Sequence, residues 1–115
     1  MADELELELD RLVHEPGRLA ILTVLSSVRN ADFTFLLQVT GLTKGNLSSH
    51  LSKLEAAGLL TIDKSFVRKK SHTAVALTSE GRQRIAAHWA QLDRLKQLAT
   101  APAPAPTTAP RPHDR

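Results

Sequence analysis

Two short helical patterns separated by a tight turn constrain the fold of this chain more than any other feature. Residues 35–39 place three apolar side chains at helical spacing, and Gly41 is the residue type that most often ends a helix. Thr43 is a good N-cap for a second helix, which we expect over residues 44–57 because Gly58 then stops it. The apolar positions of this second helix are Leu47, Leu51 and Leu54. The segment therefore predicts two helices joined by a short turn.

The flanking segments predict two further helices and one hairpin. Residues 16–30 repeat an apolar side chain every three positions, which predicts a helix, and residues 32–34 form a short extended link. Residues 59–67 and 72–78 are extended patterns with a basic run between them, as in a hairpin with a charged tip. A last helix is expected over residues 80–99. This order predicts a fold that is mainly α with a small β-hairpin, in the α+β class.

The two ends of the chain differ in character. Residues 3–14 have leucines at helical spacing, although their alternation of glutamate and leucine fits a strand as well. Residues 101–115 are rich in alanine and proline, which predicts an extended and solvated tail because proline lacks a backbone N–H. At 115 residues and 42% hydrophobic, the chain is long enough for one compact domain. We therefore expect one domain over residues 1–99 and a tail over residues 100–115.

Charge is distributed unevenly along the chain. Residues 1–15 carry six acids and one base, and residues 16–115 carry fourteen bases and six acids. The two parts therefore have net charges of −5 and +8, which add up to the overall +3. A basic body favours a polyanionic partner, and the alternative is an ordinary solvated surface.

The second helix and the hairpin supply the groups that a DNA duplex requires. The polar residues on the helix are Thr43, Lys44, Gly45, Asn46, Ser48, Ser49, His50 and Lys53, and the cations of the hairpin are Lys64, Arg68, Lys69 and Lys70. The major groove admits one helix, in which the Asn46 amide would pair with adenine and lysines would hold phosphates. The hairpin cations would lie at the minor groove or the backbone. Gly45 either brings the backbone close to DNA or is simply tolerated in a first turn.

Apolar side chains near both ends exceed what one small core covers. They are Leu5, Leu9 and Leu12 near the N-terminus and Ile85, Trp89, Leu92 and Leu95 in the last helix. We expect these side chains to form a homodimer interface, and the alternative is that they pack within one protomer. A twofold dimer places the two copies of the helix over residues 44–57 about 34 Å apart, which predicts an imperfect palindrome as the DNA site.

Several other classes of protein are disfavoured. The chain has no cysteine, and its five histidines are scattered without paired carboxylates or a glycine-rich phosphate loop, so we expect neither catalysis nor a metal or cofactor. The acidic N-terminus does not have the pattern of a secretion signal, and no segment is apolar enough for a membrane span. We expect a cytoplasmic protein.

Several motifs then occur in a familiar order. They are Phe33-Thr34-Phe35-Leu36, the run from Gly41 to Leu51, the run from Lys53 to Leu59, and Leu77-Thr78-Ser79-Glu80-Gly81-Arg82. Over residues 9–97 the chain resembles the small bacterial winged-helix regulators of the MarR/ArsR-like group. The resemblance implies a winged helix-turn-helix fold with N- and C-terminal dimerisation helices. It implies a sequence-specific regulator of transcription, with residues 43–57 as the recognition helix and residues 64–72 as the wing. We expect a repressor, and the sequence leaves activation open as the alternative.

Two other uses of such a fold remain open at this level. A winged helix can dock a protein instead of DNA, since a fold does not dictate its partner, but the second helix shows Lys, Asn, Ser and His where a docking face would show large apolar residues. RNA binding needs aromatic stacking platforms, and the chain has three Phe, one Trp and no Tyr. The sequence also leaves open whether an unidentified small-molecule effector modulates binding.

Overall fold

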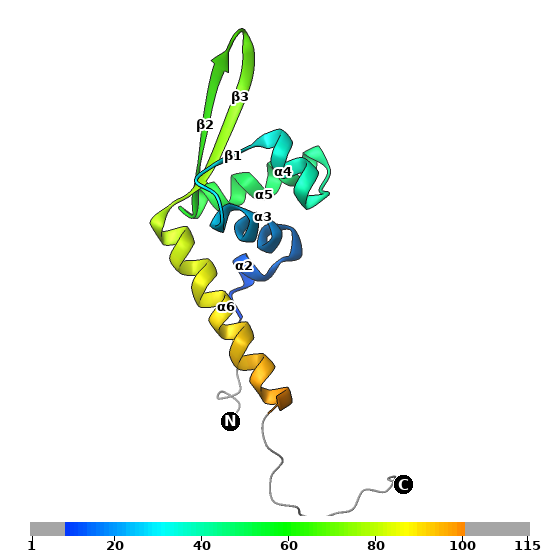
Figure 1. The fold of residues 1–115 in the computed structure, drawn as a ribbon, viewed down its shortest axis with the longest axis vertical. Helices are drawn as coiled ribbons and strands as arrows, with labels where there is room; N and C mark the ends of the chain where they lie inside the picture. The colour runs from blue at the N-terminus through cyan, green and yellow to red at the C-terminus, as the bar shows by residue number, and fades with distance from the viewer. Residues whose placement is uncertain (1–8, 101–115) are drawn as a thin grey trace, which may run out of the picture.

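A computed structural model describes residues 9–100, and it places a group of packed helices between a projecting hairpin and a long final helix (Figure 1). The elements in chain order are α2 (Arg11–His14), α3 (Pro16–Ser26), β1 (Ala31–Asp32), α4 (Phe33–Thr40), α5 (Lys44–Ala56), β2 (Leu60–Val67), β3 (Lys70–Leu77) and α6 (Ser79–Thr100). The strands form an antiparallel sheet in the order β1–β3–β2. The predicted fold class is confirmed. The tail was expected over residues 100–115, but Thr100 is the last residue of α6; residues 101–115 lie outside the described residues, as does most of the expected N-terminal helix.

Side-chain caps fix where the helices begin. The Glu15 carboxylate accepts a hydrogen bond from the Arg18 N–H at 2.8 Å and so caps α3. The Thr43 hydroxyl accepts one from the Asn46 N–H at 3.1 Å and caps α5, as its sequence position predicted. Gly41 ends α4 in the left-handed conformation, with φ of 72°, which glycine adopts without steric cost. These local bonds set the tight turn between α4 and α5.

The core lies where α3, α4 and α5 meet the sheet and the first turns of α6. The predicted leucines of α5 are buried, and they pack with side chains from each of these elements. The fully buried core residues include Ile21, Leu22, Leu25, Leu36, Leu47, Leu54, Leu59, Val75 and Ile85. In α4 the buried side chain is Leu36, whereas Phe35 and Val39 are 42% and 49% exposed. The short α4 therefore lies at the rim of the body with only one face covered.

The structure corrects two predicted boundaries. Helix α3 ends at Ser26 rather than near Asn30. At this end of the helix, the Ser26 and Ser27 hydroxyls donate hydrogen bonds to the carbonyls of Thr23 and Val24, and these bonds compete with continuation of the helix. The hairpin turn contains two residues, Arg68 and Lys69, and β3 begins at Lys70 within the expected four-residue tip. Pairing of Lys70 with Val67 extends the ladder to the end of the hairpin.

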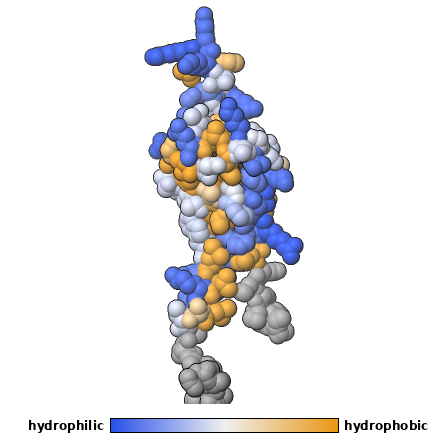
Figure 2. Space-filling model, turned by 90° about the vertical axis from the view of Figure 1, so that its right-hand side faces the viewer, coloured by the Kyte–Doolittle hydropathy of each residue, from blue (hydrophilic) through white to orange (hydrophobic). Residues whose placement is uncertain are grey.

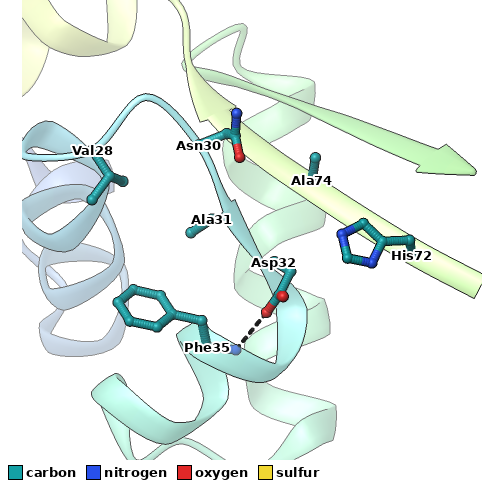
Figure 3. A pocket seen from close by; sticks show the side chains of 7 residues that line it. All are labelled: Val28, Asn30, Ala31, Asp32, Phe35, His72 and Ala74. Atoms are coloured by element: carbon teal, nitrogen blue, oxygen red, sulfur yellow. Dashed lines mark hydrogen bonds between the residues drawn. The ribbon is translucent and has the colours of Figure 1, made fainter. Parts of the chain in front are cut away.

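A short strand joins the helices to the sheet. Ala31 and Asp32 pair with Val75 and Ala74 of β3, and β1 continues directly into α4 (Figure 3). The extended link expected over residues 32–34 is therefore wrong at Phe33 and Thr34, which form the first turn of α4. The Asp32 carboxylate accepts a hydrogen bond from the Phe35 N–H at 2.7 Å, which caps α4. The residues around this junction line a hollow of about 330 Å³; they are Val28, Asn30, Ala31, Asp32, Phe35, His72 and Ala74. The hairpin is therefore fixed to the helices through β3.

Candidate nucleic-acid interface

The polar face of α5 is exposed, and the leucine face opposite it is buried. Side chains of this face and of its cap are exposed at Thr43, Lys44, Gly45, Asn46, Ser48, Ser49, Ser52 and Lys53. Sequence reasoning missed Ser52, although its spacing of four residues from Ser48 places both on one side of a helix. Within residues 9–100, neither Lys44 nor Lys53 takes part in an ion pair. The face presents hydroxyl, amide and ammonium groups to solvent.

His50 departs from the predicted face. Its side chain is 17% exposed and lies against the start of α3, with Nδ1 3.3 Å from Arg18 Nη1 and Nε2 3.6 Å from Glu15 Oε1. The residue stands at the border between the buried and exposed sides of α5, so helical periodicity alone leaves its direction undecided. The structure directs it into the protein, and we do not count it among the groups that reach a ligand.

The wing, formed by β2, β3 and their turn, carries four exposed cations away from the helices. They are Lys64, Arg68, Lys69 and Lys70, and Figure 2 shows hydrophilic residues gathered at this end of the molecule. Arg68 and Lys69 have φ of 54° and 67°, which is the two-residue hairpin geometry that Asn-Gly adopts most easily. Each non-glycine residue in this region costs on the order of 1 kcal/mol. The turn therefore contains two cationic residues in a strained backbone conformation.

The structure brings the base of the wing next to α5. A groove of about 240 Å³ lies between them, with Leu51 and Ile62 among its apolar residues and Ser48, Ser52 and Lys64 among its polar ones. Lys64 and Phe66 share one side of β2 with Ile62 because strand side chains alternate. Sequence reasoning missed Phe66, which is 77% exposed. The polar face of α5 and one side of the wing thus border a common groove.

The side chains predicted for a dimer interface fall into three groups. Trp89 and Leu95 are 40% and 36% exposed on α6, Leu92 is half-buried, and Leu98, which was not predicted, is 62% exposed. Leu9 is half-buried and Leu12 packs against the core. Leu5 lies outside the described residues. Figure 2 shows hydrophobic residues gathered where α6 leaves the body.

Ile85 does not belong to this apolar stripe of α6. Its side chain is 1% exposed and is part of the core of the protomer. Their four-residue spacing places Ile85 and Trp89 on the same face of the helix. The core that covers Ile85 does not extend as far as Trp89, which is exposed. The stripe available to a partner therefore begins at Trp89.

Polar side chains tie α2 to α6. Arg84 Nε donates to the Asp10 carboxylate at 2.9 Å, and His14 Nδ1 lies 3.0 Å from Nε2 of the buried His88. Burial alone would raise the pKa of Asp10, but the hydrogen bond from Arg84 and those from the Val13 and Leu12 N–H groups hold this pKa below its usual value. The same contact raises the pKa of Arg84. The pair is therefore charged at neutral pH.

We expect Asp10→Asn to lower the free energy of unfolding at neutral pH by about 1 kcal/mol, because asparagine keeps the cap but loses the charge-assisted bond. A carboxyl whose folded pKa is lowered stabilises the fold above its unfolded pKa, and this stabilisation is lost as the pH falls through the folded pKa. The difference between the two proteins should therefore shrink in acid. Urea unfolding at about pH 7 and pH 3, with the exposed Asp93→Asn as control, measures it. An equal difference at both pH values would contradict the assignment.

Two further observations concern other kinds of site. None of the helices formed by residues 9–100 combines the length and the hydrophobicity that a membrane span requires. Nor does this part of the chain hold a group of three or more His, Asp or Glu side chains placed to bind a metal ion.

Solved structures share this fold. The transcriptional regulator homologue from Pyrococcus horikoshii OT3 has a TM-score of 0.77 at 28% identity, over 86% of this chain and 98% of that one. A MarR-family transcriptional regulator from Silicibacter pomeroyi has a TM-score of 0.61 at 19% identity, over 90% of this chain and 66% of that one. The second likeness is one of fold alone.

Sequence comparison agrees with the fold. The uncharacterized protein MJ0432 of Methanocaldococcus jannaschii is 35% identical over 65 residues, which are 56% of this chain and 71% of that protein. Residues 18–96 match the family described as winged helix DNA-binding domain, so the matched segment includes most of α3, all elements from β1 to β3 and most of α6. This chain belongs to the winged helix DNA-binding domain family.

Proposed function

We propose that this protein regulates transcription by binding duplex DNA as a homodimer, with α5 in the major groove and the wing at the minor groove or backbone. The wing turn carries the proposal. Arg68 and Lys69 both adopt a left-handed conformation at the far end of the hairpin, and within the described residues neither forms an ion pair. Cations in a strained and unpaired position fit a polyanionic ligand, because its phosphates would supply the opposite charge that the described residues do not.

The polar face of α5 supplies the sequence-reading part of the proposal. Asn46 and Ser49 offer an amide and a hydroxyl to base edges, while Lys44 and Lys53 lie at the two ends of the helix, where they would contact phosphates. Thr43, Gly45 and Ser48 lie beside them, and Lys64 and Lys70 extend the cationic surface along the wing. His50 is left out of this set because it is directed toward α3.

We further propose that the protein represses its target genes. Occupying a promoter is enough to exclude a polymerase, whereas activation needs a second surface that recruits one. We assign the polar face of α5 and the wing to DNA and the apolar stripe of α6 to the dimer, so neither of these surfaces is left to recruit a polymerase. Whether a small-molecule effector releases the protein from DNA stays a prediction.

Selection from a random duplex library tests the proposed function. Full-length protein should enrich an imperfect palindrome whose half-sites lie about one helical turn apart, since a twofold dimer presents two copies of α5. Competition with unselected duplex should then show at least about a thousandfold preference for the enriched site. Enrichment of unrelated sequences, or of none, would refute sequence-specific binding and favour a winged helix that docks a protein.

Substitutions in the apolar stripe of α6 test the proposed dimer interface. Trp89→Ala together with Leu95→Ala should raise the dimer dissociation constant about a hundredfold or more, because two large side chains per protomer lose burial. Gln97→Ala is the matched control, since it removes an exposed side chain from the opposite side of the same helix. Sedimentation equilibrium gives both constants. A wild-type protein that stays monomeric, or a double variant that dimerises as tightly as wild type, would contradict this interface.

A further inference from the structure

The inward direction of His50 has a specific chemical basis. Arg18 Nη1 is always a donor, so the 3.3 Å contact requires His50 Nδ1 to be the acceptor. The ring proton then sits on Nε2, which faces the Glu15 carboxylate at 3.6 Å. A doubly protonated ring would point an N–H at the guanidinium. With its proton on Nε2, the ring presents an acceptor toward the cation and an N–H toward the anion.

The surroundings of His50 are shaped for the ring. A Cβ added to Gly17 would lie 2.8 Å from His50 Nε2, 2.9 Å from its Cδ2 and 3.2 Å from Glu15 Oε1, so the ring occupies most of the space that a side chain at position 17 would need. Gly17 is buried in the first turn of α3, where alanine would be the better helix former. The glycine thus allows α5 to approach α3 through His50.

The segment that His50 contacts is itself fixed to α6. We call residues 14–18, which link α2 to α3, the α2–α3 corner. Arg18 Nε donates to the Leu12 carbonyl at 2.7 Å, and Glu15 caps α3. At the other end of α2, Asp10 bonds Arg84 of α6. A continuous set of polar contacts therefore runs from α6 through α2 and the corner to His50 on α5.

We propose that His50 is a positioning residue, which holds α5 against the α2–α3 corner and so sets the angle of the polar face of α5 relative to α6, without itself contacting DNA. This inference rests on the proposed function. In a dimer held together by α6, the angle of α5 decides whether both copies enter the groove in register. Losing the contact should therefore reduce sequence-specific binding more than binding through phosphates.

The experiment is a double-mutant cycle between Gly17→Ala and His50→Ala, read by affinity for the selected site and for random duplex. Each single variant should lose about tenfold or more in affinity for the selected site and about twofold or less for random duplex, where phosphate contacts dominate. The double variant should bind like His50→Ala alone, because the added methyl group no longer meets a ring. His50→Gln, whose amide oxygen can accept from Arg18, should recover much of the loss.

Several outcomes overturn the proposal. If His50 read a base directly, Gly17→Ala would leave site affinity unchanged or the two losses would add, and the His50→Ala loss would fall on one base pair. Equal losses on selected and random duplex would mean a general loss of folding instead of positioning. Glu55→Ala, which removes an exposed side chain of α5 outside the proposed set of DNA contacts, is the control and should show no coupling to Gly17→Ala. A wild-type protein that binds no duplex would refute the proposed function itself, whereas specific wild-type binding with an additive cycle refutes only the role of His50.

Discussion

Replacing Lys44 by alanine and the wing turn Arg68–Lys69 by Asn–Gly should lower the affinity for duplex DNA at about 100 mM salt by roughly a thousandfold or more. Each protomer offers about four phosphate contacts, from Lys44, Lys53, Arg68 and Lys69. For the dimer, this number predicts a slope of roughly −7 for log K against log salt. The triple variant leaves about one contact per protomer and a slope of roughly −2. Fluorescence anisotropy over a salt series measures both quantities.

The Asn–Gly replacement separates charge from geometry. Arg68 and Lys69 have positive φ, so alanine there would strain the turn, whereas Asn–Gly is the preferred sequence for it. The variant should therefore fold at least as stably as wild type. Arg29→Ala with Arg94→Ala removes two exposed cations outside the proposed interface and should lose only a few-fold in affinity. A control variant that loses as much as the triple variant would show that only total charge matters.

Gly81→Ala should lower the free energy of unfolding by about 3 kcal/mol or more, the largest stability effect that we expect from a single methyl group. The new Cβ would overlap the Leu59 carbonyl oxygen and lie 2.9 Å from the carbonyl carbon. Backbone atoms cannot turn away as a side chain can, so α6 would have to move away from the backbone at Leu59. Urea unfolding followed by circular dichroism measures the loss.

Gly45→Ala is the matched control for Gly81→Ala. A Cβ at position 45 meets nothing within 4 Å, and alanine is the better helix former, so this variant should be more stable than wild type by about 0.5 kcal/mol. The two substitutions make the same chemical change in the first turns of two helices. Similar unfolding free energies for both would contradict the packing of α6 against Leu59.

Local sequence signals were enough to predict α5 and the hairpin. The Thr43 cap, the leucine spacing and the left-handed Gly41 each act within a few residues, so they survive any tertiary arrangement. The turn was less predictable, because Arg68 and Lys69 adopt φ values against their own preference. Its two-residue length depends on the pairing of β2 with β3 rather than on turn propensity.

Tertiary contacts decided what the sequence could not. The direction of His50 depends on Gly17 and Arg18, about thirty residues earlier in the chain. The periodicity of α5 alone cannot predict contacts with residues so far away in the sequence. Ile85 and Trp89 share a face by spacing, but only the folded body shows that one is in the core and the other is not. The Asp10–Arg84 pair likewise joins residues that lie far apart in the sequence.

Binding of the wild-type protein to random duplex DNA of about three helical turns, measured by anisotropy across a salt series, tests the central claim most directly. We predict binding at low salt that weakens with a log–log slope of roughly −7. No binding even at low salt, or binding that does not depend on salt, would contradict a cationic wing and reading helix on DNA and would favour a winged helix that docks a protein.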